Sequence, residues 1–434
     1  MNRTLTAAAI AIAGAWAREA VAQDGPRQAA SCSGPLDADV VVRCALAASP
    51  DVRATRAELD AGGGRRATAG VWLPSNPTVT ALVSNRRRPA PEAASVLNWS
   101  VVLSQEVEIA GQRGARQDQA DAEIAARARR VGVAEQEVAA GALAAYYEAI
   151  AAQETVRFAA ELAETAQTLA AFAEGRAKEA MLAGVEADVA RAEATRIGLV
   201  RFEAERRLSE SRAALAVLLD VDARALALPS ALAVPAFQLP AGEPLEDQAL
   251  RLRGEVAAAE MERQVLERRL ALVRRERVPN LTLSAFAERG EINDRILGVG
   301  LAIPLPLPAP VGRTRAGEIA ETMAQIRAAE SSEELVRRRI RLEVARARAA
   351  LNARQGATDL FGVDLVKRAR TDLSSLREAI ASRQLSLREG LQWQRTFIEL
   401  LQADIEVRLG TVLAWVDLRR VVGLSFVVSQ GGAR

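Results

Sequence analysis

The chain contains no His, and this limits the reactions that its side chains could catalyse. Without an imidazole, Ser-His catalysis, histidine general acid–base chemistry and most transition-metal sites are excluded. Carboxylates are plentiful, with 55 Asp and Glu among 434 residues, but they follow helix faces at positions expected to be solvated. The sequence therefore predicts that the chain is not an enzyme, holds no cofactor and has no resident metal.

The two cysteines are the other reactive side chains, and both follow a segment typical of secretion signals. Residues 1–22 combine Arg3, an apolar stretch over residues 5–17 and an A-x-A cleavage pattern at residues 20–22. In an exported chain, Cys32 and Cys44 favour a disulfide that would pin the mature N-terminus to the first helix. Lipidation of Cys32 is the alternative.

Charge and composition exclude a nucleic-acid partner and favour long helices. The chain is 50% hydrophobic but only 3% aromatic, and its formal net charge is +2. A nucleic-acid footprint would need a net basic patch with aromatics. The abundant Ala instead favours helices that pack through small side chains.

The organisation of the chain is a duplication. In each half a Pro/Asn turn leads into two alternating segments, a Gly/Arg-rich corner and a long Ala-rich helical pair. We predict a signal peptide at 1–22, a leader at 23–36, a first repeat at 37–227, a Pro-rich linker at 228–245, a second repeat at 246–425 and a C-terminal tail at 426–434.

The alternating segments are predicted strands at 78–86, 98–108, 280–288 and 295–304. Each has roughly the length, about 9–11 residues, that a tilted strand needs to cross a bilayer. Trp99 suits an interfacial position. An ordinary hairpin in a globular α+β domain is the alternative.

The helical pairs are predicted at 112–220 and 315–422. Apolar residues seven apart, such as Leu143 with Ile150 and Leu162 with Leu169, indicate supercoiled packing. Roughly sixty residues of helix would extend about 90 Å, which exceeds an ordinary globular domain.

Four strands in one chain are too few to close a sheet around a pore. Open sheet edges are not tolerated in lipid, so any membrane-spanning sheet would need several copies of the chain. Three copies would supply twelve strands, an even number within the range of outer-membrane β-barrels.

Residues 105–116 and 299–307 resemble the strand-to-helix corners of the outer-membrane efflux family, typified by TolC. With the duplicated order, the resemblance covers about residues 37–425, and the first corner looks nearest to the heavy-metal branch. It implies a mainly α fold with membrane β: a homotrimer with a twelve-stranded outer-membrane β-barrel in lipid and long helical hairpins forming a periplasmic α-barrel.

The same resemblance implies where the periplasmic end would be closed and contacted. In the first hairpin the matching tip contains Gly184, Glu186 and Asp188, which would contact an adaptor. In the second hairpin the aperture candidates are Glu389, Arg388, Gln392 and Arg383. Arg383 stands where the family usually has Gly, and Gln392 stands at a position that is often acidic. Solvated tip charges without a gating role are the alternative.

The resemblance implies an exit duct for a tripartite efflux pump, passing metal ions or drugs from the periplasm to the exterior. Its partners would be a periplasmic adaptor and an inner-membrane transporter of the RND class, or an ABC exporter if the channel serves type I protein secretion. A periplasmic coiled-coil adaptor or scaffold is the third reading. It predicts one helical hairpin between small β domains, whereas the sequence predicts two hairpins.

Overall fold

A computed structural model describes residues 32, 34–87, 95–235, 243–289, 294–307, 310–312, 314–382 and 386–426. The predicted signal peptide and residues 427–434 of the predicted tail lie outside these ranges. In chain order the elements are β1 (Gly34–Pro35), α1 (Ala38–Ala48), α2 (Pro50–Ala69), β2 (Thr78–Arg87), β3 (Ser95–Val107), α3 (Gln112–Lys178), α4 (Gly184–Leu219), a 3-10 turn η1 (Ala223–Ala225), β4 (Leu226–Ala227), α5 (Leu245–Leu252), α6 (Gly254–Arg275), β5 (Leu281–Arg289), β6 (Arg295–Ala302), α7 (Ala316–Leu360), α8 (Val363–Ala381) and α9 (Leu387–Val422).

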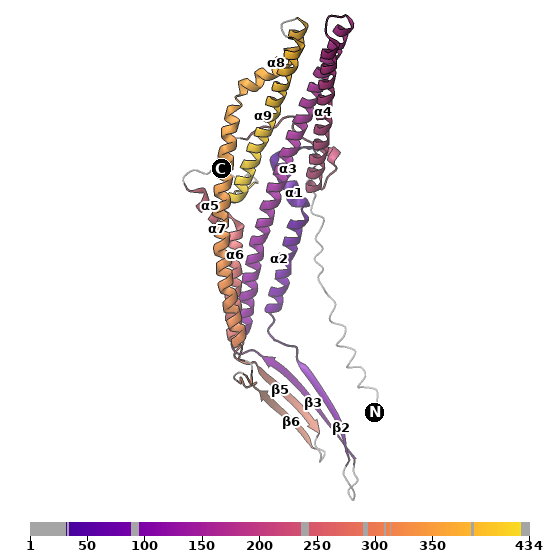
Figure 1. Ribbon diagram of the computed structural model, residues 1–434. Helices are drawn as coiled ribbons and strands as arrows, with labels where there is room; N and C mark the ends of the chain where they lie inside the picture. The colour runs from indigo at the N-terminus through magenta and orange to yellow at the C-terminus, as the bar shows by residue number, and fades with distance from the viewer. Residues whose placement is uncertain are drawn as a thin grey trace, which may run out of the picture.

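The helices form an elongated body with the four-stranded sheet at one end and two helical hairpin tips at the other (Figure 1). Helix α3 alone has 67 residues, which corresponds to about 100 Å at 1.5 Å per residue. Leu143, Ile150, Leu162 and Leu169 on α3 are all buried, which confirms the predicted seven-residue contact pattern. No described helix is both long enough and apolar enough to cross a bilayer.

Each half opens with two consecutive helices, divided by a turn whose chemistry is readable in the sequence. Asp37 caps α1 by accepting from the backbone N–H of Val40 at 2.7 Å. Ser49 then caps α2, and Pro50 occupies the first turn, where its missing N–H costs no helical hydrogen bond. In the second half, Arg253 separates α5 from α6.

The outgoing arm of the second hairpin consists of two helices. Helix α7 ends at Leu360 and α8 begins at Val363. Glycine at position 362 lowers helix propensity at this point. Beyond the break, Ala369 and Leu373 of α8 pack in one core with residues of α3, α4 and α9.

The four long strands form one antiparallel sheet in the order β2-β3-β5-β6. The two halves of the chain meet where β3 pairs with β5, for example Leu103 with Ala285. Strands β2 and β6 each have one neighbour in the described sheet, so both outer edges are unpaired there. A second, two-stranded parallel sheet joins β1 to β4 beside the helices and was not predicted.

The main core lies where the two halves overlap at mid-length. It brings α1, α3, α4 and α9 together with Leu36 of the leader region and Leu232 of the predicted linker, both buried. Much of this core is Ala, so the helix axes approach closely and residues far apart in sequence share one packed unit.

Candidate functional site: hairpin tips, the contact between hairpins and the sheet

The second tip, residues 386–392, begins helix α9 with a capping box. The Ser386 hydroxyl accepts from the Glu389 backbone N–H at 3.3 Å, and the Glu389 carboxylate accepts from the Ser386 backbone N–H at 3.0 Å. The Ser386 hydroxyl also donates to this carboxylate at 2.7 Å. These hydrogen bonds lower the pKa of Glu389, the side-chain bond contributing most. The carboxylate therefore stays ionised and is directed to its own helix terminus.

The other candidate side chains of the second tip have different surroundings. Arg388 and Gln392 are exposed. Arg383 lies outside the described residues. The structure therefore brings Glu389, Arg388 and Gln392 into the first turns of α9, with the acidic group already engaged in capping.

The first tip, residues 179–188, joins α3 to α4. Gly184 begins α4, Glu186 lies in its first turn and Asp188 follows, with Gly184 and Asp188 exposed. The N-cap of α4 is Ala183, and no side-chain hydrogen bond caps this helix in the described structure. The tip also exposes Val185, which gives it a mixed apolar and acidic surface.

The two tips pack against each other through small residues. Leu387 of α9 is buried among Ala170 and Ala173 of α3 and Ala187 and Ala190 of α4. The second hairpin therefore lies against the first at this end of the molecule, and the predicted sites of both hairpins fall within one neighbourhood.

One buried polar side chain lies further along α9. Gln394 has no exposed surface, and neither its amide nitrogen nor its amide oxygen has a hydrogen-bond partner among the described residues. An unpaired buried polar group costs about 1–3 kcal/mol. The burial of Gln394 was not predicted. It could have been inferred from the sequence, because Gln394 interrupts a series of apolar residues at helical spacing: Leu387, Leu391, Ile398 and Leu401.

A second buried group joins the hairpins further along α3. Glu154, 3% exposed, accepts from the Leu232 backbone N–H at 2.9 Å and from Arg408 of α9 at 2.9 and 3.2 Å. Arg370 of α8 lies 3.4 Å away, and Arg408 also donates to Asp404 at 3.0 Å. Burial would raise the pKa of Glu154, but the hydrogen bonds and the two arginine charges outweigh it, so the pKa is lowered.

This cluster connects four segments: α3, the chain between the repeats, α8 and α9. It was not predicted either, although Glu154 lies four residues from both Ile150 and Phe158 on an otherwise apolar face of α3. A carboxylate in such a position requires a buried partner.

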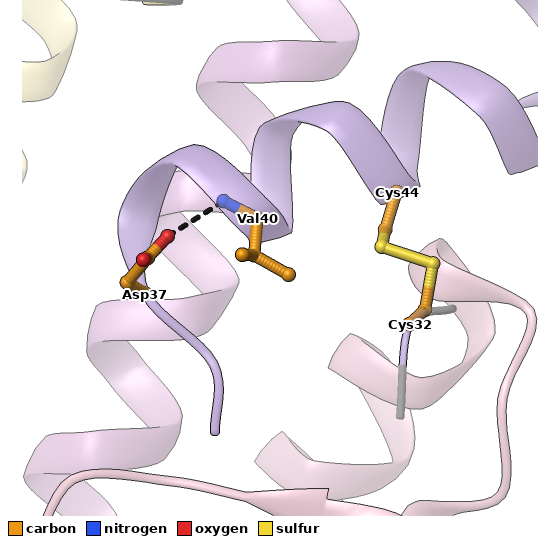
Figure 2. The surroundings of a disulfide bond; sticks show 4 residues. All are labelled: Cys32, Asp37, Val40 and Cys44. Atoms are coloured by element: carbon orange, nitrogen blue, oxygen red, sulfur yellow. Dashed lines mark hydrogen bonds between the residues drawn. A yellow bond between two sulfur atoms is a disulfide. The ribbon is translucent and has the colours of Figure 1, made fainter. Parts of the chain in front are cut away.

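Cys32 and Cys44 are joined by a disulfide in the structure (Figure 2). Cys44 is buried on α1, so the bond fixes residue 32 against the mid-length core. With its sulfur in this bond, Cys32 has no thiol for a lipid thioether.

The two faces of the four-stranded sheet differ in chemistry. The register places mainly aliphatic residues on one face, here called the apolar sheet face: Val79, Ala81, Val83, Trp99, Val101, Leu103, Leu283, Ala285, Ala287, Leu297, Val299 and Leu301. The opposite, polar sheet face includes Thr78, Thr80, Leu82, Ser100, Val102, Ser104, Thr282, Ser284, Phe286, Glu288, Ile296, Gly298 and Gly300.

The apolar sheet face is open to the surroundings in a single copy of the chain. Val83 is 71% exposed, Leu297 82% and Val299 87%. Continuous exposed apolar surface of this kind marks a site for protein or membrane contact.

Within the described ranges, no group of three or more His, Cys, Asp or Glu side chains could hold a metal ion.

Comparison with known proteins gives one curated relative and several solved structures. No protein-family model matches the chain. The cobalt-zinc-cadmium resistance protein CzcC of Cupriavidus metallidurans is 31% identical over 292 residues, which is 64% of this chain and 64% of CzcC. The match thus spans less than two thirds of the length of that relative.

The structural similarity extends over nearly the whole chain. The structure of CusC, studied for transmembrane channel formation, matches with a TM-score of 0.74 and 15% identity, covering 89% of this chain and 92% of CusC. The outer-membrane channel OprN matches with a TM-score of 0.74, 18% identity and coverages of 90% and 91%. The outer-membrane protein VceC of Vibrio cholerae matches with a TM-score of 0.70 and 16% identity, covering 90% of this chain and 96% of VceC. The chain therefore has the fold of these structures, which is the TolC-like fold predicted from the sequence.

Proposed function

We propose that this protein is a passive outer-membrane exit duct of a tripartite efflux pump, extending into the periplasm, and that it has no enzymatic activity. The observation that carries the proposal is the exposed apolar sheet face at one end of a long helical body. In a membrane-spanning β-barrel, one face of the sheet is apolar and contacts lipid, and the other face is polar and lines a water-filled interior.

The unpaired edges of β2 and β6 support assembly of three copies. Pairing β6 of one copy with β2 of the next would join three four-stranded sheets into one closed twelve-stranded sheet and leave no edge in lipid. Exposed apolar side chains also follow the helices, with Leu199 and Phe202 on α4 and Leu335 and Leu342 on α7. These would be covered by neighbouring copies.

The cargo and partners follow from the relatives and remain part of the proposal. CzcC is named for cobalt, zinc and cadmium resistance, and we infer that this duct passes divalent metal cations delivered by an RND-class transporter. A periplasmic adaptor would contact the tips around Gly184, Glu186 and Asp188. Because a duct must release its cargo, the passage would bind ions weakly.

The first experiment is to measure the detergent-corrected mass of the protein extracted from outer membranes. A trimer from that fraction supports the duct. A monomer in the soluble periplasmic fraction contradicts it and favours an adaptor or scaffold.

The aperture assignment needs its own test, the conductance of Glu389→Ala and Arg388→Ala channels in planar bilayers. If Glu389 or Arg388 lines the aperture, its removal changes conductance or ion selectivity. Because Glu389→Ala also removes a helix cap, Ser386→Ala is the matched control, which loses the cap but keeps the carboxylate. Unchanged conductance and selectivity in both tip variants would remove the aperture from this tip.

A further inference from the structure

The polar sheet face contains a small apolar patch formed by Leu82, Val102, Phe286 and Ile296. Val102 and Phe286 are direct cross-strand partners, in the row Thr80–Val102–Phe286–Gly298. Leu82 and Ile296 belong to the adjacent row, further from the helices, and lie diagonal to Val102 and Phe286. At such separations, long and aromatic side chains on one face reach each other.

The ring of Phe286 is positioned by a glycine on the next strand. A Cβ added to Gly298 would collide with Cζ and Cε1 of the ring, so the ring lies across the Gly298 backbone. Phe286 is only partly buried, so part of the ring stays open to the space bounded by this face. The patch therefore presents an aromatic surface on the polar sheet face.

A carboxylate lies next to the patch. Glu288 follows Phe286 by two residues on the same strand face and shares a row with Leu82, Ser100 and Ile296. Among the described residues, no ion pair of Glu288 is found. The wall thus combines an aromatic face, aliphatic side chains and a negative charge within two adjacent rows.

We propose that this patch is a weak binding site for organic cations that carry alkyl groups. An aromatic face attracts a cation, the aliphatic neighbours favour its alkyl groups and the carboxylate complements its charge. The inference rests on the proposed function, because the polar sheet face must line the passage. Three copies would place three such sites around it.

The same groups would bind a bare divalent metal ion poorly. Hard and borderline cations prefer several oxygen, nitrogen or sulfur ligands, whereas each copy offers one carboxylate beside apolar groups. The patch therefore distinguishes between two kinds of cargo: it retains alkylated cations and lets hydrated metal ions pass.

The test uses the full-length protein in planar lipid bilayers with tetramethylammonium and tetrabutylammonium as probes. The proposal predicts that tetrabutylammonium blocks the potassium chloride current at lower concentration than tetramethylammonium does. Glu288→Gln and Phe286→Leu should each weaken the tetrabutylammonium block by about twofold to fivefold, the range for one exposed ionic or cation–π contact. Thr80→Ala, in the same row as Phe286, is the matched control and should leave the block unchanged.

The outcomes separate this inference from the proposed function. Suppose that the wild-type channel conducts, but both probes block it equally or neither variant changes the block. This result would contradict the proposed binding site and leave the proposed duct unaffected. A wild-type protein that gives no conductance overturns the duct and the patch together. Glu288→Gln keeps the side-chain shape, so it decides the question if Phe286→Leu does not assemble.

Discussion

The two helical hairpins follow one plan but differ in the continuity of their arms and in the chemistry of their tips. The first hairpin has an unbroken outgoing helix, α3, and a return helix, α4, that has no side-chain N-cap in the described structure. The second has an outgoing arm divided at residues 361–362 and a return helix, α9, that begins with a capping box. The two repeats therefore differ in their outgoing segment, which is one continuous helix in the first hairpin and two consecutive helices in the second.

The difference indicates which contacts stabilise each hairpin. The first depends on a long packed seam of small and apolar residues between α3 and α4. The second also has apolar contacts, through Leu373, Leu387 and Ile398. It adds specific polar groups, because Glu154 joins it to α3 and Ser386 caps the start of α9. Gln394 is buried without a hydrogen-bond partner among the described residues. If this comparison is correct, single substitutions should affect the second hairpin more than the first.

The largest expected effect is that of Glu154→Ala. The change leaves Arg408 and the Leu232 N–H without their buried acceptor, which should cost about 3–5 kcal/mol in the free energy of unfolding. Thermal unfolding of the purified protein followed by circular dichroism measures this. Glu161→Ala, one exposed position two turns further along α3, is the control and should stay within about 0.5 kcal/mol.

Glu154 also predicts a pH dependence. Its pKa is lowered in the folded protein, so the stability it contributes is present above the pKa of an unfolded glutamate, about 4.3, and is lost as the pH falls towards the folded value. Below that ordinary value, the stability of the wild type should fall more steeply than that of Glu154→Gln. Parallel acid profiles would show that the Glu154 cluster does not hold the hairpins together.

Gln394→Leu should stabilise the folded protein. It replaces two unpaired polar atoms with an apolar group of similar size in a fully buried position, and the expected gain is about 1–3 kcal/mol. A higher melting temperature measures the gain. The exposed neighbour Gln392→Leu is the matched control, with a change within about 0.5 kcal/mol; a destabilised Gln394→Leu protein would mean that the amide has a partner.

Ser386→Ala tests the difference between the two tips. Loss of an N-cap hydroxyl typically costs about 1 kcal/mol, and amide hydrogen exchange in the first turn of α9 should become faster. The reciprocal variant Ala183→Ser would give α4 the cap it lacks and should slow exchange there. If neither tip responds, capping does not account for their difference.

The smallest expected effect is that of Gly362→Ala at the joint. A Cβ at this position meets no atom within 4 Å, so the change should stabilise the protein by about 0.4–1 kcal/mol through the unfolded chain. Hydrogen exchange around residues 358–366 should slow, which would make the second arm more like the first. Gly356→Ala, within α7, controls for helix propensity alone; faster exchange in Gly362→Ala would show that the joint requires glycine.

Much of the fold could be predicted, because it depends on local and periodic signals. The alternation that marks β2 and the seven-residue spacing along α3 are visible in the sequence, and the structure confirms the long hairpins and four strands. The joint at residues 361–362 was missed because one Gly in a long helical pattern is usually tolerated. The short pairing of β1 with β4 depends on contacts 192 residues apart, as between Gly34 and Leu226.

The candidate site was less predictable. The tip residues came from the resemblance, which gives positions but not hydrogen bonds, so the capping role of Glu389 was not foreseen. Glu154 and Gln394 were recognisable only as polar residues in apolar series. Their partners lie on other elements, and a single sequence does not show which elements meet.

The unpaired edges of β2 and β6 have a consequence for the life of a newly exported copy. On the proposed assembly, the sheet is complete only after three chains meet, so its formation is a concentration-dependent step rather than a folding event within one chain. Until then each copy exposes two templates for incorrect strand pairing. The waiting time before encounter, rather than the stability of the finished channel, would then set how many copies are lost to aggregation or proteolysis.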